Sequence, residues 1–206
     1  MNSNMVILVG KISSEKKFSH EIYGEGFYTY TMEIPRLSEF CDNLPLTISE
    51  RLLVDLDLKI GDIIKVEGQL RSYNKFVDGS NRLVLTIFVR DIIDVYSNEE
   101  EKNPNQIYLD GYICKKPIYR ETPFGREITD LLVAVNRAYN KSDYIPCISW
   151  GRNARFSSKL QIGDHIRIWG RIQSREYQKK YSEGNVVNKV AYEVSISKME
   201  KVEEEI

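Results

Sequence analysis

The 206-residue chain contains two copies of one domain, and this internal repeat limits its possible folds more than any other feature. When the sequence is shifted by 101 residues, VGKI at Val9–Ile12 aligns with DGYI at Asp110–Ile113. At a shift of 102 residues, KIGDIIKVEGQLRS at Lys59–Ser72 aligns with QIGDHIRIWGRIQS at Gln161–Ser174. Each half of the chain must therefore be able to adopt the same fold.

A polar stretch separates the two copies. SNEEEKNPN at Ser97–Asn105 is highly charged and contains a proline, which is typical of a linker. We expect a first domain at residues 1–97, a linker at 98–105, a second domain at 106–198 and a short acidic tail at 199–206.

Each copy has the pattern of a small β-barrel. In the second copy, alternation of apolar and polar residues predicts strands at 128–137, 145–150, 166–173 and 187–195. After the third strand, RLLVDLDLKIG and RNARFSSKLQIG each predict one short helix closed by a glycine, Gly61 or Gly163. A generic β-sandwich explains the strands but not the helix. We therefore expect an all-β protein of two tandem OB-folds, which are five-stranded Greek-key barrels, each with one short helix between strands 3 and 4.

The sequence contains no set of residues that indicates catalysis. Its two histidines and three widely spaced cysteines match no metal-site or disulfide pattern, and no glycine-rich phosphate loop occurs. No apolar run approaches the roughly 18 residues that span a bilayer. We expect a cytoplasmic protein that is not an enzyme, has no metal or cofactor, and does not enter the membrane.

Basic residues are concentrated in the second copy. Residues 106–198 contain 16 Lys and Arg against 9 Asp and Glu, a net charge of +7, whereas residues 1–97 contain 11 against 14, a net charge of −3. A positive charge on one domain indicates binding of a polyanion, so the second copy is the expected binding domain.

The third and fourth strands of the second copy each have two different faces, because side chains alternate along a strand. We expect an interior set on the third strand of Ile145, Cys147 and Ser149, and an outer set of Tyr144, Pro146, Ile148 and Trp150. On the fourth strand and its hairpin, the expected outer residues are Arg167, Trp169, Arg171, Arg175, Tyr177, Lys179 and Tyr181. Rings stack on unpaired bases and cations contact phosphates, so this face predicts a surface for single-stranded nucleic acid. For Trp169, a packing or interface role is equally open.

Four segments of the second copy carry a resemblance to a known family: LLVAVNRAY at 131–139, YIPCISWGRNA at 144–154, LQIGDHIRIWGRIQSREY at 160–177 and YEVSIS at 192–197. Through them, nearly all of residues 106–200 resembles the DNA-binding domain of bacterial single-stranded DNA-binding proteins. The resemblance implies that bases stack at four positions, which here are Tyr139, Tyr144, Trp150 and Tyr177. The complete predicted site consists of Tyr139, Tyr144, Trp150, Tyr177, Arg137, Arg152, Arg167, Trp169, Arg171, Arg175, Lys179 and Lys180.

The first copy departs from this pattern. At the four matching positions it has Ser38, Asn43, Ser49 and Lys75, none of which is aromatic. Phe40, Tyr73 and Phe76 lie close to these positions in sequence and are candidate substitutes. We expect this copy to serve structure and assembly more than DNA binding.

The resemblance also bears on assembly and partners. Members of this family with one OB-fold per chain typically form tetramers, so a homodimer of this chain would present four OB-folds; the alternative is a monomer whose two copies pair with each other. The family usually ends in a long tail with an acidic tip that recruits replication enzymes. This sequence stops at KVEEEI soon after the last strand, so we do not expect recruitment by that route.

We therefore expect non-catalytic binding and protection of single-stranded DNA in replication, recombination or repair, mainly by the second OB-fold. Two alternatives remain open from the residues alone. One is an assembly module, such as a primosome accessory protein, whose outer face binds protein. The other is an RNA-binding OB protein, because nothing in the sequence indicates whether the site accepts or rejects the 2′-hydroxyl that distinguishes RNA from DNA.

Overall fold

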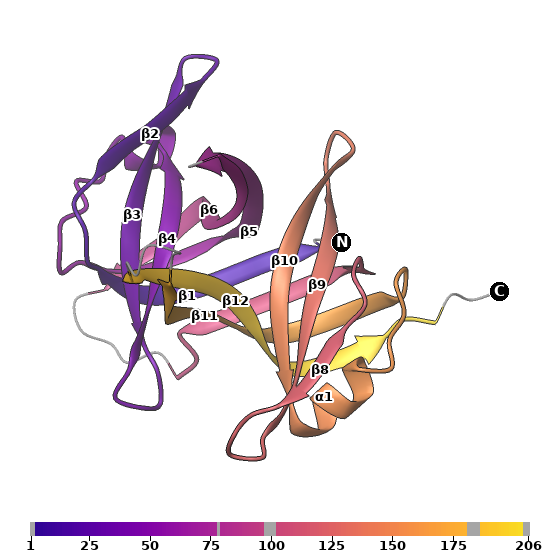
Figure 1. The fold of residues 1–206 in the computed structure, drawn as a ribbon. Coiled ribbons are helices and arrows are strands. Elements are labelled where there is room, and N and C mark those ends of the chain that lie inside the picture. Colours follow the sequence, from indigo (N-terminus) through magenta and orange to yellow (C-terminus); the bar gives the residue numbers. More distant parts are fainter. Residues whose placement is uncertain (1–2, 78, 97–101, 181–185, 204–206) are drawn as a thin grey trace.

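The structure of the chain is a computed structural model that describes residues 3–77, 79–96, 102–180 and 186–203. Within these ranges the chain folds into two β-barrels, one from each copy of the repeat (Figure 1). The first barrel consists of β1 (Asn4–Ile12), β2 (Lys17–Ile22), β3 (Glu25–Pro35), β4 (Cys41–Ser49), the 3-10 helix η1 (Glu50–Leu53), β5 (Ile63–Val77) and β6 (Ser80–Tyr96). The second consists of β7 (Asn105–Ile113), β8 (Ile118–Glu121), β9 (Glu127–Arg137), β10 (Lys141–Trp150), the α-helix α1 (Gly151–Ser157), β11 (His165–Lys180) and β12 (Val186–Lys201).

Each barrel closes in the strand order of an OB-fold. β1 pairs with both β3 and β5, and a parallel pairing of β4 with β6 completes the first barrel. β7 likewise pairs with β9 and β11, and β10 pairs with β12 in parallel. The short β2 and β8 follow β1 and β7 after a break and pair with β3 and β9, so each broken strand counts as one of five. The predicted tandem OB-folds are confirmed.

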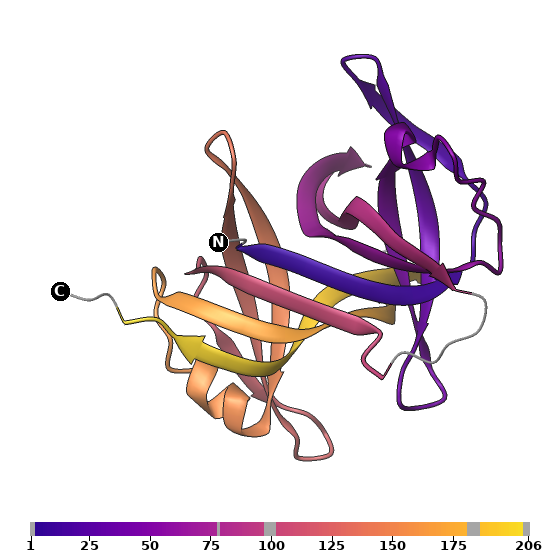
Figure 2. The same cartoon turned by 180° about the vertical axis from the view of Figure 1, so that it is seen from behind.

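The two barrels are joined by the antiparallel pairing of β1 with β7. Val6 lies opposite Ile107 in this pairing, and both are buried. The described strands thereby form one continuous sheet, and Figure 2 shows β1 and β7 side by side between the barrels. Buried apolar residues of both barrels belong to a single cluster. The buried apolar residues of the two copies are therefore continuous across the junction.

Two buried asparagines occupy matching places as the first residues of β1 and β7. The side-chain amide of Asn4 donates to the carbonyl of Leu70 (2.8 Å) and accepts from the N–H of the same residue (3.0 Å). Asn105, which the sequence places in the linker, begins β7 and makes the same two bonds with Ile172 (2.7 and 2.8 Å). Each amide satisfies two backbone groups that burial would otherwise leave unpaired.

The glycine that ends KVEG (Lys65–Gly68) and RIWG (Arg167–Gly170) is present in both copies for a steric reason. The pairing of β11 with β12 shifts register between Trp169 and Gly170, and a Cβ at Gly170 would lie 2.2 Å from the carbonyl oxygen of Ser195. Gly68 occupies the same place in the first barrel, where a Cβ would lie 2.4 Å from the carbonyl oxygen of Phe88. Only glycine allows the two backbones to approach this closely.

The helix after the third strand differs between the barrels and from the prediction. It is an α-helix in the second barrel but a single 3-10 turn in the first. In the second barrel the hydroxyls of Ser149 and Ser157 lie 2.7 Å apart and tie the helix to β10, and the residues at a shift of 101, Ile48 and Leu56, cannot form this bond. Gly163 does not close the helix, which ends at Ser157. It has a φ of 93° and lies in the turn before β11.

The predicted faces of β10 are confirmed except at one residue. Ile145, Cys147 and Ser149 are buried, whereas Tyr144 and Trp150 are exposed on the opposite face. Ile148 was expected on the exposed face, but it is buried. It lies between its partners Asp130 on β9 and Ser195 on β12, whose side chains share its face of the sheet.

Candidate nucleic-acid interface

Three of the four predicted stacking residues follow the β9–β10 hairpin of the second barrel. Tyr139 lies in the turn with a φ of 62°, and 94% of it is exposed. Tyr144 and Trp150, near the two ends of β10, are 45% and 38% exposed. None of these three rings contacts another aromatic ring of the described residues. The hairpin thus carries three exposed or partly exposed rings that no other described aromatic ring covers.

The position of Trp150 is determined by the buried hydroxyl groups beneath it. Trp150 is the last residue of β10 and immediately precedes α1. The Thr129 hydroxyl donates to the carbonyl of Ala154 (2.8 Å), and the Ser149 hydroxyl lies within hydrogen-bond distance of Ser157. These bonds hold the helix against β9 and β10 next to Trp150, which is partly exposed.

The two arginines of α1 are in different surroundings. Arg155 forms an ion pair with Glu127 (2.9 Å). Arg152 is exposed and forms no ion pair with any of the described residues. Arg152 is therefore the helix cation that is available to an anionic ligand.

The fourth predicted stacking residue, Tyr177, lies on a hairpin that crosses onto the first barrel. In Figure 1 the β11–β12 hairpin passes over β4. The N–H of Ser174 donates to Asp42 Oδ1 (2.8 Å), and the N–H of Asn43 donates to the Ser174 hydroxyl (3.1 Å). Tyr177, three residues later and 38% exposed, has the guanidinium of Arg175 at 5.9 Å from its ring centroid. Arg175 also forms an ion pair with Glu193 (3.5 Å).

The first barrel makes the reciprocal crossing. Its β5–β6 hairpin reaches β10, where the N–H of Ser72 donates to Asp143 Oδ1 (2.9 Å). The N–H of Tyr144 donates in turn to the Ser72 hydroxyl (2.7 Å). Ser72 and Ser174 align at a shift of 102, and Asp42 and Asp143 align at a shift of 101. The repeat therefore gives each barrel one hairpin that is fixed to the other barrel.

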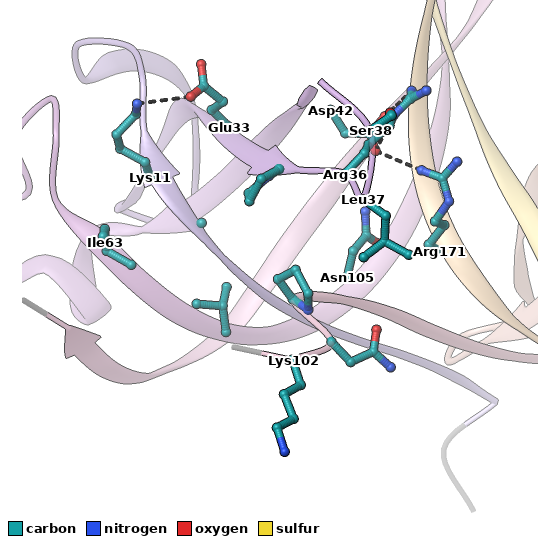
Figure 3. Close-up of a pocket in the computed structure, with 15 residues that line it drawn as sticks. Lys11, Glu33, Arg36, Leu37, Ser38, Asp42, Ile63, Lys102, Asn105 and Arg171 are labelled. Atoms are coloured by element: carbon teal, nitrogen blue, oxygen red, sulfur yellow. Dashed lines mark hydrogen bonds and ion pairs between the residues drawn. The ribbon is translucent and has the colours of Figure 1, made fainter. Parts of the chain in front are cut away.

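Arg171 belongs to the contact between the barrels. Asp42 is almost completely buried and accepts from the guanidinium groups of both Arg36 and Arg171, the latter at 3.0 Å. Figure 3 shows the two arginines converging on Asp42 at the wall of a cavity of about 820 Å³. Leu37 and the linker residue Lys102 also line this cavity. Contact of Arg171 with nucleic acid stays a prediction, since one side of its guanidinium is already bound.

Arg137 lies at the matching junction around Asp143. Its guanidinium is 3.4 Å from the buried Asp143 carboxylate. Arg71 of the first barrel is close enough to interact with both groups, and burial together with the charge of Arg137 lowers the pKa of Arg71. The guanidinium of Arg71 lies over the Phe88 ring at 4.3 Å, and its buried Nε has no hydrogen-bond partner among the described residues. The charges of two arginines, one from each barrel, thus act on each other beside Tyr144.

Trp169 and Arg167 lie on a different surface from the β9–β10 hairpin. The Trp169 ring is 5.3 Å from the ring of Tyr108 on β7, and the Lys198 ammonium on β12 lies 4.3 Å from its centroid. Arg167 pairs with Asp110 (3.1 Å). Burial of Asp110 opposes ionisation, but hydrogen bonds from His165 and Arg167 hold the pKa of its carboxyl below the ordinary value. In Figure 2 this sheet of β1, β7, β11 and β12 lies in front of β9 and β10.

Three predicted residues at the end of the β11–β12 hairpin are described only in part or not at all. Lys179 and Lys180 end β11, and their side chains lie outside the described part of the chain, as does all of Tyr181.

Among the described residues, no group of three or more His, Cys, Asp or Glu side chains is arranged to hold a metal ion. No helix in the described ranges is long and apolar enough to cross a membrane.

Sequence reasoning missed the part that the first barrel plays beside Tyr144. The pattern of strands assigns Ser72 to the first barrel and both Asp143 and Tyr144 to the second. The bonds of Ser72 to these two residues span sequence separations of 71 and 72 positions. A signal was nevertheless present, because a serine and an aspartate recur at the same places in both copies. Residues kept in both copies without an obvious role within one barrel are candidates for a contact between barrels.

Comparison with known proteins places the second barrel in a defined group. Residues 104–202 match the model of the "Single-strand binding protein family". Single-stranded DNA-binding protein A of Bacillus subtilis is 30% identical over 96 residues, which cover 43% of this chain and 56% of that protein. Single-stranded DNA-binding protein B of the same organism is 32% identical over 81 residues, which cover 36% of this chain and 72% of that protein. The chain spans about half the length of most of the curated relatives that it matches.

A solved structure resembles both barrels together. The wild-type single-stranded DNA binding protein from Thermus aquaticus aligns with a TM-score of 0.76 at 19% sequence identity, over 98% of this chain and 94% of that chain. At this identity the likeness shows the fold, and it extends across the junction between the two barrels.

The junction at Asp42 generates a prediction about stability. Asp42→Ala leaves two partly buried guanidinium groups and the N–H of Ser174 without their acceptor, so we expect the free energy of unfolding to fall by about 3 kcal/mol. Glu39→Ala removes an exposed carboxylate three residues earlier and is the matched control. Urea unfolding measures both variants. Equal midpoints would show that the buried aspartate does not stabilise the junction.

Proposed function

Because this chain belongs to the single-strand binding protein family, we propose that it binds single-stranded DNA without catalysing a reaction. The bound strand would be held extended, with its bases stacked on protein rings and its phosphates near cations. A strand bound in this way cannot pair with its complement and is shielded from nucleases. Such binding serves replication, recombination or repair.

The observation that carries this proposal is the group of exposed or partly exposed rings, Tyr139, Tyr144 and Trp150, on the basic domain. Each base presents a flat π-face, so stacking tolerates any sequence and suits a protein that coats a strand. Arg152 is an exposed cation next to Trp150, and the net charge of +7 on residues 106–198 attracts the phosphates. Tyr177 and Arg175 extend the surface where the β11–β12 hairpin passes over β4.

We propose unequal roles for the two barrels. The first barrel carries a net charge of −3 and has Ser38, Asn43, Ser49 and Lys75 at the four stacking positions. What it supplies is structural. Its β1 strand pairs with β7, its Asp42 carboxylate accepts from the β11–β12 hairpin, and its Ser72 hydroxyl accepts from the N–H of Tyr144 on β10. The second barrel would therefore provide most of the binding energy, from a position that the first barrel holds fixed.

The two tryptophans of the chain allow a direct test of the proposed surface. Trp169→Phe leaves Trp150 as the only tryptophan, and Trp150→Phe leaves Trp169. We expect oligo-dT to quench the fluorescence of Trp150 strongly and that of Trp169 weakly, because the Trp169 ring already contacts Tyr108 and Lys198. The binding constant should fall with salt at a log–log slope of about −0.7 for each phosphate contacted. An absence of binding by the wild-type protein at low salt would refute the proposed function.

Substitution of the stacking residue measures its contribution. Trp150→Ala should weaken oligo-dT binding by about 1–3 kcal/mol, which is the usual effect of removing one base stack. Because the ring is directed away from the core, the thermal unfolding temperature should change little. Tyr23→Ala, which removes a fully exposed ring at the β2–β3 turn of the first barrel, is the control. Equal losses in the two variants would mean that the effect is not specific to β10.

We further propose that two chains form a homodimer with four OB-folds, since two-fold pairing is the commonest closed symmetry. The exposed face of the β1–β7 sheet, which carries Tyr108, Tyr112 and Trp169, is the surface that supports this proposal. Light scattering after size exclusion should then give twice the 24.0 kDa of one chain. A mass of one chain at all concentrations, with and without oligo-dT, would rule out the dimer.

A further inference from the structure

We propose that the cavity between the first barrel and the linker binds a small amphipathic anion, which is a molecule with one phosphate or carboxylate group on an aliphatic body. The cavity has a volume of about 820 Å³ and is lined by residues of β1, the β3–β4 turn and the segment that leads into β7 (Figure 3). Pockets that enclose small organic ligands generally have volumes of roughly 300–1,000 Å³. The cavity is therefore large enough for such a ligand.

The charge of the lining favours an anion. Two carboxylates line the cavity, and both are already paired: Glu33 with Lys11 (3.0 Å), and Asp42 with Arg36 and Arg171. Lys102 also lines the cavity, is exposed, and forms no ion pair with any of the described residues. Four cations against two carboxylates give the lining a net charge of +2. An anionic group would be attracted into the cavity.

Arg171 retains donors for such a group. A guanidinium has five N–H groups, and the structure gives that of Arg171 two side-chain acceptors, Asp42 Oδ2 at 3.0 Å and Gln173 Oε1 at 3.1 Å. The side chain of Arg171 is 39% exposed. A phosphate or carboxylate in the cavity can thus accept from Arg171 while the bond to Asp42 is kept.

The rest of the lining suits an aliphatic body. The apolar residues that line the cavity are Val9, Pro35, Leu37, Ile63 and Pro104. The Leu37 side chain is completely exposed, so a ligand that covers it removes apolar surface from water. None of the described residues that line the cavity is aromatic, so the cavity lacks rings on which a base would stack. Its lining therefore fits an alkyl chain better than a nucleobase.

This lining is particular to the first copy. Three residues of β1 and β5 align with polar or aromatic residues of the second copy: Val9 with Asp110, Lys11 with Tyr112, and Ile63 with His165. In the second barrel these side chains contact one another, because Asp110 is hydrogen-bonded to His165 (2.5 Å) and the Tyr112 ring stacks on the same imidazole, with 4.6 Å between centroids. The cavity is thus not a general consequence of the repeated fold, and it gives the first barrel a ligand of its own.

The chemistry of the ligand is tested with four probes that separate the anionic group from the body: octyl phosphate, octanoate, octanol and inorganic phosphate. Isothermal titration calorimetry on the full-length protein measures each affinity. We expect octyl phosphate or octanoate to bind roughly tenfold or more tightly than both octanol and inorganic phosphate, because octanol lacks the charge and inorganic phosphate lacks the apolar area. The stronger of the two octyl anions identifies the preferred head group.

The location is tested with the double variant Leu37→Glu/Lys102→Glu, which adds negative charge at two exposed positions of the lining. Ile118→Glu/Lys116→Glu makes the same substitutions at exposed positions of the second barrel and is the matched control. We expect the first variant to bind the octyl anion roughly tenfold or more weakly than wild type, because like charges repel it, and the control to bind like wild type. Unfolding temperatures close to that of wild type verify that both variants are folded. Leu37→Ala/Lys102→Ala, which adds no charge, should also weaken binding.

Several results would overturn the inference. Wild-type protein that binds neither octyl anion has no such site, and inorganic phosphate that binds as tightly as octyl phosphate indicates a simple anion site. Equal losses in the two glutamate variants would mean that binding follows the overall charge and not the cavity. If Leu37→Glu/Lys102→Glu weakens oligo-dT binding as much as octyl phosphate binding, the cavity belongs to the path of the DNA strand. Unchanged oligo-dT affinity together with lost binding of the octyl anion supports a separate ligand site.

Discussion

The pairing of β1 with β7 is the interaction on which the rest of the structure depends. Each of these strands is part of its own barrel, and each would otherwise leave an unpaired backbone edge along its first residues. By pairing with each other, they join both barrels into one sheet and one core. This places each barrel within reach of the long hairpin of the other. The crossings at Ser72 and Ser174 are possible only in that arrangement.

The crossings explain why a barrel without stacking residues is retained. A buried aspartate on each barrel accepts from the serine N–H of the other barrel's hairpin, so both hairpins are held by the opposite barrel. Loss of the first barrel would free the β11–β12 hairpin that carries Tyr177 and would remove the serine that binds the backbone of Tyr144. The first barrel thus fixes the geometry of the proposed ligand surface.

Much of this could be predicted from the sequence because the relevant signals are local or periodic. The repeat identified two similar domains, and alternation along β10 separated Ile145 and Cys147 from Tyr144 and Trp150. What could not be predicted depends on contacts between the copies. Arg171 had the pattern of an outward cation, but its partner Asp42 is 129 residues away. Ile148 had the parity of an exposed residue, yet its neighbours on β9 and β12 cover it. Trp169 shares the outward parity of its strand, but it lies directly opposite Tyr108 of β7, and the two rings pack together.

The central claim is that a single strand lies along the β9–β10 hairpin of the second barrel, with its bases on Tyr144 and Trp150. The most direct measurement is ultraviolet cross-linking of oligo-dT to the full-length wild-type protein, followed by mass spectrometry of the linked peptides. The account predicts cross-links in the peptides that contain Tyr144 and Trp150. Cross-links confined to the peptides of Tyr108 and Trp169 would contradict it, because the strand would then lie on the opposite surface of the molecule.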